Sequence, residues 1–502
     1  MTADVCFVLE GSYPYVRGGV SSWTHQLIRG MPDLKFSLLT IVASRKDLKL
    51  VYELPPNVVE VEDVVLSYPD AGLDGSARVP DGFMARVERL HRALRDDEAA
   101  ARVQAMEFLG DAVCAGPGND AAIQALSSSE AWDLMLRIYH ERGHGGSSFN
   151  AYFYTYLQSH FRFFRSLRAA VPRARLYHAV STGYAGIAAV SASLRTGRPL
   201  LLTEHGIYVN ERNMDITMLD WLDGRPVFQG IDLSSAPSAI RGIWMRFFEF
   251  MGRLTYDRAA LITTLFGGNL LMQIEYGADH RKLQIVPNGV DVARLGALPR
   301  NPDPARPRVC LIGRVVPIKD IRTFIKACAL VARQLPGVSF EILGPYDEDP
   351  PYYESCRQLV KECGLEPQFV FAGHVDLSKE FSTITLGVLT SMSEGLPLVM
   401  LETMACGIPN VASRVGACEE IVMGGRGEDR KLGPAGIVTG VAAPEETARG
   451  IIRLLTDPHL YESMARACRE RVQRYYDQTQ VLDEYRTIYR RLGAQPDSGR
   501  TA

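Results

Sequence analysis

The stretch Ser393-Glu394-Gly395-Leu396-Pro397-Leu398-Val399-Met400-Leu401-Glu402 decides how this chain is organised, because it joins a buried strand to a helix. The apolar run Leu386–Leu389 before it is predicted to be the strand. Pro397 is predicted at the first helical position, where its missing N–H costs no hydrogen bond. The helix would present unpaired backbone N–H groups and the positive end of its dipole, which favour phosphate. Glu394 and Glu402 would flank that anion site.

The spacing of the two glutamates is weak evidence by itself, because such pairs also occur by chance in helical chains. The context favours a site, since Glu-Gly-Leu-Pro directly after an apolar strand is not a solvated helix face. Two carboxylates beside a phosphate-binding helix end suit an enzyme that binds a sugar and a ribose on either side of a diphosphate.

The composition of the chain is that of a soluble globular protein. Its 502 residues allow about two to four domains, and 46% hydrophobic with 23% charged residues is ordinary. The net charge of −3 gives no reason to expect nucleic acid or an anionic membrane surface as a partner. The nine cysteines are scattered without a C-x-x-C pair, which predicts reduced core thiols and no zinc site.

The sequence gives no sign of a membrane span. It has no apolar run of about 18 residues, and residues 5–9 are predicted to form a short buried strand rather than a signal segment. We therefore expect a cytoplasmic protein, and any association with the inner membrane would go through a partner.

The first domain is predicted over residues 1–300 from strands that alternate with helices. It begins with a strand at 5–9, a glycine loop at 10–19, a helix at 21–29 and a strand at 36–43. Further strands are predicted at 176–180, 200–203, 260–264 and 283–286. This alternation is typical of an open parallel sheet.

Residues from about 65 to 165 interrupt the alternation. Helices are predicted over 83–110 and 130–142, and residues 151–167 are predicted to form a helix rich in aromatic side chains. A helix of this composition is more often part of a core than a ligand platform. We interpret the block as a helical insertion in the first domain.

A proline-dense segment, 299–307, is the best candidate for a linker. Further strands are predicted after it, at 309–312, 338–343, 369–372, 386–389, 410–413 and 436–438. We expect a second doubly wound domain over 308–475, followed by a C-terminal segment, 476–502. Ligands of open α/β sheets bind at the carboxyl ends of the strands, and two such domains would face each other across a cleft.

Two cations follow the first strand of the second domain. Arg314 comes directly after that strand, and Lys319 comes at the start of the next helix. A guanidinium and an ammonium at the carboxyl end of a strand suit a diphosphate, although two solvated cations would give the same pattern. These cations are expected at the same sheet edge as the Glu394 loop, so the cations and the glutamate pair support the same site.

The first domain offers a glycine pair and two histidines. Gly18 and Gly19 end the loop after the first strand, where glycine lets the backbone approach a phosphate. The chain has no G-x-G-x-x-G and no G-x-x-x-x-G-K-[ST], which counts against a dinucleotide cofactor and against a P-loop nucleotidase. His205 and His178 lie at strand ends, where a histidine is more often structural. His205, which a glycine follows, is the better candidate for contact with a hydroxyl or an oxyanion.

These motifs, taken in order, resemble the retaining glycosyltransferases of family 4. The resemblance covers both domains and rests on the glycine pair, Arg314 with Lys319, Glu394 with Glu402, and Val286-Pro287-Asn288-Gly289-Val290-Asp291. Two further stretches are more narrowly similar to the PelF-type enzymes of bacterial Pel exopolysaccharide synthesis. They are Glu10-Gly11-Ser12-Tyr13-Pro14-Tyr15-Val16-Arg17-Gly18-Gly19-Val20-Ser21-Ser22-Trp23 and Thr203-Glu204-His205-Gly206-Ile207-Tyr208.

The resemblance implies a GT-B fold of two Rossmann-like domains, with the last helices crossing back to the first domain. It also implies a UDP-sugar donor, retention of configuration and no cofactor or catalytic metal. Arg314 and Lys319 would neutralise the leaving diphosphate, Glu402 would hold the ribose, and Glu394 would lie near the anomeric carbon. His205 would act on the sugar or acceptor. The remaining expected substrate contacts are His178, Gly18, Gly19, Gly373, His374, Val375, Gly395, Leu396, Pro397 and Leu398.

The resemblance implies as partners a growing polysaccharide and an inner-membrane synthase or export protein. Two other interpretations stay open: a GT-B epimerase or phosphorylase, and a silent scaffold that binds a nucleotide sugar. One departure concerns Gly416-Ala417-Cys418, where many family members carry a glycine pair. We expect that loop to be slightly displaced and not to touch the catalytic groups.

Overall fold

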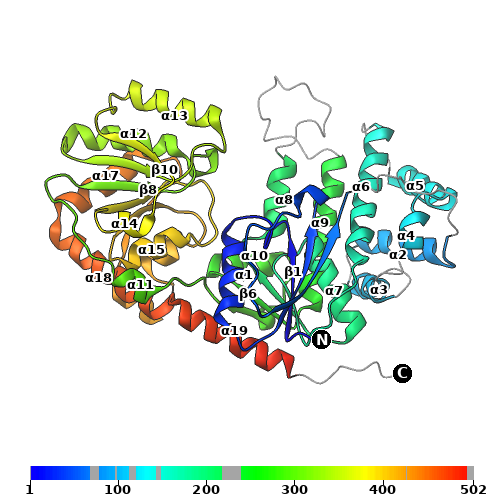
Figure 1. The fold of residues 1–502 in the computed structure, drawn as a ribbon. Helices are drawn as coiled ribbons and strands as arrows, with labels where there is room; N and C mark the ends of the chain where they lie inside the picture. Colours follow the sequence, from blue (N-terminus) through cyan, green and yellow to red (C-terminus); the bar gives the residue numbers. More distant parts are fainter. Residues whose placement is uncertain are drawn as a thin grey trace. The chain divides into compact units, whose positions relative to one another are not determined.

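In a computed structural model of the chain, the described residues are 2–67, 79–96, 99–111, 120–142, 148–217, 239–425 and 427–494. They divide into two compact units (Figure 1). Unit 1 comprises Met1–Thr264, Leu270–Gln284 and Tyr485–Ala502, and unit 2 comprises Leu265–Asn269 and Ile285–Glu484.

Unit 1 is built on a seven-stranded sheet of order β3-β2-β1-β4-β5-β6-β7. Its strands are β1 Val5–Glu10, β2 Phe36–Val42, β3 Val58–Val65, β4 Tyr177–Ala179, β5 Leu200–Glu204, β6 Leu261–Thr264 and β7 Leu283–Ile285. The central strands are buried along almost their whole length, as expected for parallel strands with both faces covered. All of them except β3 were predicted. The missed strand alternates valine with acidic residues and lies at the edge of the sheet.

Helices cover the sheet and form the predicted insertion. The sheet-associated helices are α1 Gly19–Gly30, α7 Tyr184–Thr196, α8 Tyr208–Thr217, α9 Ala239–Arg258, α10 Gly267–Glu275 and α19 Gln478–Gly493. The insertion consists of α2 Phe83–Asp96, α3 Ala99–Gly110, α4 Asp120–Ala125, α5 Ser129–Arg142 and α6 Phe149–Leu167. Short 3-10 turns are η1 Arg45–Asp47 and η3 His280–Lys282.

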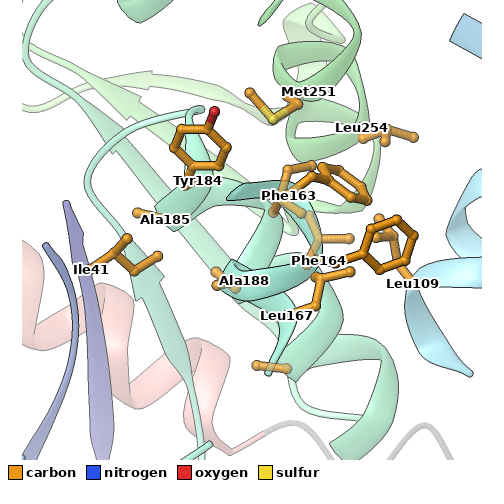
Figure 2. Packing of buried hydrophobic residues seen from close by; sticks show 14 of the residues in the cluster. Ile41, Leu109, Phe163, Phe164, Leu167, Tyr184, Ala185, Ala188, Met251 and Leu254 are labelled. Carbon is orange, nitrogen blue, oxygen red and sulfur yellow. The ribbon is translucent and has the colours of Figure 1, made fainter. Parts of the chain in front are cut away.

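The aromatic helix α6 belongs to the core of unit 1, as predicted. Its residues Phe163, Phe164 and Leu167 are almost completely buried and pack with residues of other helices, such as Leu109 and Ala188 (Figure 2). Because one continuous apolar cluster joins the insertion to the sheet, the insertion is part of the core of the unit and not an appended module.

Unit 2 is built on a six-stranded parallel sheet of order β10-β9-β8-β11-β12-β13. Its strands are β8 Arg308–Ile312, β9 Ser339–Leu343, β10 Phe369–Gly373, β11 Leu386–Leu389, β12 Asn410–Ser413 and β13 Gly436–Thr439. Its helices are α11 Val292–Gly296, α12 Ile321–Gln334, α13 Pro350–Glu362, α14 Leu377–Glu380, α15 Leu398–Ala405, α16 Cys418–Met423, α17 Pro444–Thr456 and α18 Pro458–Tyr475, with 3-10 turns η4 Pro317–Lys319 and η5 Gly427–Leu432. Every strand of this unit was predicted to within one residue.

The unit boundaries differ from the expected domain boundaries. The proline-dense segment 299–307 lies inside unit 2, because Asn301 N–H donates to Ser382 O at 2.7 Å and Arg300 donates to the carbonyls of Phe381 and Ile384. At the other end, the division falls within α19, between Glu484 and Tyr485.

The structure also bears on the cysteines and on membrane spans. Eight cysteines lie in the described part of the chain, all with free thiols, and Cys114 lies outside it. Among the described residues, no helix combines the length and the apolar character needed to cross a bilayer.

Candidate functional site

At the carboxyl edge of the unit 2 sheet, the backbones of the loops after β8 and β9 approach each other closely. Gly313 directly follows β8 and Gly344 directly follows β9, with φ values of 156° and 158°. A Cβ on Gly344 would lie 2.1 Å from Gly313 O, so that position accepts only glycine. Val315 N–H also donates to Pro345 O at 2.9 Å, which fixes the loop after β8 to the loop after β9.

Lys319 and Glu394 form an ion pair at this edge. Lys319 Nζ lies 2.5 Å from Glu394 Oε1, and Ser391 Oγ donates to the same oxygen at 2.5 Å. The two side chains are only 20% and 13% exposed, so the pair is shielded from solvent. The predicted proximity of the β8 loop and the Glu394 loop is therefore observed as a direct contact.

Backbone contacts hold that ion pair in place. Thr390 Oγ1 lies 3.0 Å from the carbonyl oxygens of both Lys319 and Asp320. Met392 N–H donates to Ile318 O at 2.8 Å. Because the two loops are joined at three points besides the ion pair, the charged groups sit on a rigid support.

The helix α15 begins one residue later than predicted. Pro397 is the N-cap in an extended conformation (φ −73°, ψ 106°), and Leu398 is the first helical residue. No side chain caps the helix and its first turn, which is fully described, contains no acidic residue. This geometry is consistent with the expected anion-binding position at the start of the helix.

Gly416 lies against the Glu394 loop, so the expectation that its loop does not touch the catalytic groups is wrong. Gly416 has a φ of 50°, and a Cβ there would lie 2.1 Å from Glu394 O and 2.4 Å from Gly395 O. Ala417 N–H donates to Gly395 O at 2.8 Å. The backbone of residues 416 and 417 therefore packs directly against the loop that carries Glu394.

Glu402 is half-buried in α15. Among the described residues, no hydrogen bond or salt bridge reaches its carboxylate. Burial raises the pKa of Glu402, and the charge of Arg294 opposes that shift. An ionised carboxylate with unused acceptor capacity is suited to hydroxyl donors such as those of a ribose.

Arg314 makes a contact that the sequence did not reveal. Its NH1 group donates to both carboxylate oxygens of Glu348, at 2.6 and 2.7 Å. Glu348 belongs to the triplet Asp347-Glu348-Asp349 after β9, so an Asp-x-Asp pattern is present in the chain. The expectation of a metal-free site therefore cannot rest on the absence of that pattern, and the prediction that the chain lacks it is wrong. Asp349 caps α13 by accepting from Tyr352 N–H at 3.0 Å, so that acid is already used structurally. Among the described residues, no cluster of three or more metal-ligating side chains occurs.

Gly373 is the last residue of β10, and His374 and Val375 follow it at the same edge. Gly373 is buried with a φ of 68°, and a Cβ there would lie 3.2 Å from Cε1 of Tyr346. The Tyr346 ring stacks on Tyr353 with centroids 4.5 Å apart. His374 is exposed, so the loop presents both backbone and side-chain atoms to solvent.

The glycine pair of unit 1 is exposed at the start of α1, which begins two residues earlier than predicted. Gly18 is the extended N-cap and Gly19 the first helical residue. A Cβ at either glycine would meet no atom within 4 Å. Packing therefore does not require glycine at these two positions. Close approach of a ligand to the backbone is another reason for glycine here.

The two histidines of unit 1 differ in surroundings. His178 is fully buried in β4, where Nε2 lies 2.7 Å from Thr203 Oγ1 and Nδ1 lies 2.9 Å from the Tyr489 hydroxyl. Both ring nitrogens are thus engaged in the core, and we leave His178 out of the proposed site. His205 is partly exposed and meets the Trp23 ring edge-on at 4.5 Å. Burial lowers the pKa of His205 to about 4, so it is neutral at pH 7.

Sequence reasoning missed two carboxylates at strand ends of unit 1. Glu10, at the end of β1, accepts from Ala185 N–H at 3.2 Å and from the Tyr208 hydroxyl at 3.0 Å. Glu204 is fully buried and accepts from the hydroxyl of Tyr256 at 2.7 Å. Burial raises the pKa of both acids. The sequence did offer one indication of these acids, because both lie at strand ends within the stretches 10–23 and 203–208.

Two family models match the chain. One is described as domain of unknown function DUF3492 and matches residues 3–281, more than half of the chain. The other is described as glycosyl transferases group 1 and matches residues 306–457.

Curated relatives match part of the chain. N-acetyl-α-D-glucosaminyl L-malate synthase of Bacillus anthracis is 34% identical over 173 residues, which cover 34% of this chain and 42% of that protein. D-inositol 3-phosphate glycosyltransferase of Segniliparus rotundus is 28% identical over 226 residues, which cover 42% of this chain and 47% of that protein. The chain thus spans about half the length of the curated relatives it matches.

Solved structures match nearly the whole chain. HepE of Anabaena in complex with UDP has a TM-score of 0.59 at 15% identity, covering 98% of this chain and 100% of that one. Sucrose-phosphate synthase of Thermosynechococcus elongatus has a TM-score of 0.57 at 16% identity, covering 98% and 99%. These likenesses show that the fold is GT-B, with two Rossmann-like domains.

Proposed function

Since the chain belongs to the DUF3492 family and carries a glycosyl transferases group 1 domain, we propose that it is a retaining glycosyltransferase that uses a UDP-sugar donor. The observation that carries this proposal is the rigid Lys319–Glu394 pair beside the uncapped start of α15. A cation, a carboxylate and a helix N-terminus at one sheet edge are what a glycosyl diphosphate needs, because negative charge develops on the diphosphate and positive charge on the sugar.

Different residues of unit 2 would bind different parts of the donor. Lys319 and Arg314 would stabilise the diphosphate as it leaves, and the N–H groups at the start of α15 would bind its oxygens. Glu402 would accept hydrogen bonds from the ribose hydroxyls. Backbone atoms of the loop after β10 would contact the base.

The reaction replaces one bond to the anomeric carbon by another. The bond from that carbon to the diphosphate oxygen breaks, an acceptor hydroxyl oxygen forms the new bond on the same face, and its proton leaves with UDP. Glu394, near that carbon, would stabilise the positive charge of the transition state more than the ground state. His205 of unit 1, neutral at pH 7, would hydrogen-bond a hydroxyl of the acceptor.

We further propose that the acceptor is a growing bacterial exopolysaccharide of the Pel type and that the enzyme works in the cytoplasm beside an inner-membrane synthase or export protein. The support is the similarity of the stretches 10–23 and 203–208 to PelF-type enzymes. The HepE structures in complex with UDP and with UDP-glucose support a UDP-sugar donor, while relatives described as GDP-mannose-dependent make GDP-mannose the second candidate.

The decisive experiment measures nucleotide release from a panel of UDP-sugars and from GDP-mannose, with and without an oligosaccharide acceptor. We expect UDP release that increases with acceptor and that persists in EDTA. Release of GDP alone would overturn the donor assignment. Loss of activity in EDTA with recovery in magnesium or manganese would overturn the metal-free assignment and direct attention to the Asp347-Glu348-Asp349 triplet.

A further inference from the structure

The two cations of the unit 2 site are both paired with carboxylates, but the pairs differ in exposure. The Lys319–Glu394 pair is 20% and 13% exposed, whereas the side chains of Arg314 and Glu348 are 53% and 51% exposed. An exposed ion pair contributes little to stability and is easily replaced by another anion. The Arg314–Glu348 pair is thus the one that a ligand can open.

Glu348 is kept beside Arg314 by the backbone. The loop after β8 is joined to the loop after β9 by Val315 N–H donating to Pro345 O, three residues before Glu348. Asp349, the next residue, anchors the other side of the loop as the N-cap of α13. Glu348 is therefore held at both ends near the guanidinium, and both of its oxygens accept from the same nitrogen.

We propose that Glu348 is an internal counter-ion that competes with the donor diphosphate for Arg314. This inference rests on the proposed function, because it assigns the site a nucleoside diphosphate ligand. The diphosphate displaces Glu348 from Arg314 on binding, and Glu348 returns as UDP leaves. The acid therefore lowers the affinity for UDP and accelerates its departure, while the buried Lys319–Glu394 pair stays in place.

Removing the competing charge should tighten nucleotide binding. Glu348→Gln should lower the Kd for UDP about two- to fivefold at low salt, the factor that an exposed ion pair is worth. The gain should shrink at 0.5 M salt, since exposed charges are screened there. The dissociation rate of UDP should fall by a similar factor, because affinity changes within one site appear mostly in that rate.

The experiment titrates UDP and uridine by calorimetry into the full-length chain and four variants: Glu348→Gln, Arg314→Ala, the double variant and Asp347→Asn. Asp347 is exposed on the same loop and is the matched control for a general change of charge. We expect tighter UDP binding only in Glu348→Gln, unchanged uridine binding, and no effect of Glu348→Gln once Arg314 is absent.

Three results would overturn the inference. They are equal or weaker UDP binding by Glu348→Gln, an equal gain from Asp347→Asn, and a gain that persists without Arg314. If Arg314→Ala still weakens UDP binding in those cases, the proposed function stands and only the role of Glu348 falls. Absence of UDP binding by the unaltered chain would overturn both proposals. A thermal unfolding midpoint near that of the unaltered chain confirms that each exposed variant is folded.

Discussion

Lys319 Nζ and Glu394 Oε1 lie 2.5 Å apart, so the cation and the acid that two separate sequence motifs indicated form an ion pair. Ser391 Oγ shares the same carboxylate oxygen. The pair neutralises itself before any ligand arrives, which explains how two charges can stand in a largely buried loop. Any change to one partner must then be interpreted through its effect on the other.

Lys319→Ala should lower turnover at saturating donor by about 10²- to 10³-fold, the cost of removing one preorganised charge from a transition state. It should also lower the thermal midpoint, because Glu394 would be left largely buried without its cation. Steady-state kinetics and thermal unfolding measure the two effects. Lys326→Ala, an exposed lysine of α12, is the matched control and should change neither. Turnover that survives Lys319→Ala would remove Lys319 from the mechanism.

Gly416→Ala should disrupt the Glu394 loop, because its Cβ would overlap Glu394 O at 2.1 Å. Gly433 is the matched control, since it also has a positive φ, 79°, but a Cβ there meets no atom within 4 Å. Gly433→Ala should cost only the conformational strain, about 1–2 kcal/mol. Gly416→Ala should cost more and should reduce turnover as well. The comparison uses thermal unfolding and turnover, and equal effects of the two variants would argue against a supporting role for Gly416.

Much of this architecture follows from local sequence. The buried strands were recognisable because parallel strands covered on both faces are continuous apolar runs, as in Phe36–Val42. The edge strand Val58–Val65 was missed because its acidic residues break that pattern. The nearness of Lys319 and Glu394 was predictable because strand ends of a parallel sheet share one edge.

Contacts that depend on loop paths could not be predicted. Glu348 lies 34 residues from Arg314, and nothing in its local pattern indicates the pair. The contact of Gly416 with the Glu394 backbone likewise depends on how the loop after β12 turns. The role of His178 was open for a different reason: only the fold shows that Thr203 and Tyr489 occupy both of its ring nitrogens.

Glu402→Gln should stabilise the ligand-free protein at neutral pH. Burial raises the pKa of Glu402, because it penalises the ionised carboxylate in the folded state. A group with a raised folded pKa adds stability below its unfolded pKa and loses that contribution as pH rises through the folded value. The variant should therefore have a higher thermal midpoint than the unaltered chain at pH 7–8, and this advantage should disappear toward pH 4. A variant that is less stable at pH 8 would show that the carboxylate has a stabilising partner.

Glu394 and Glu402 should separate in their effects on turnover and binding. Glu394→Gln keeps an oxygen that can accept from Ser391 and Lys319, so the loop should persist while the negative charge beside the anomeric carbon is lost. Turnover at saturating donor should fall about 10²- to 10³-fold, and UDP affinity should stay nearly intact, because the carboxylate acts mainly in the transition state.

Glu402→Ala should show the opposite pattern, because a ribose changes little during the reaction. Loss of hydrogen bonds to a charged acceptor should weaken UDP binding about tenfold or more, and uridine binding should weaken by a similar factor since the ribose is common to both. Calorimetric titration of UDP and uridine, together with turnover at saturating donor, distinguishes the two acids. If Glu394→Gln loses UDP and keeps its turnover while Glu402→Ala retains UDP and loses turnover, the placement of the two acids is inverted. That result would put the ribose at the Lys319 pair and the reacting sugar beside Glu402.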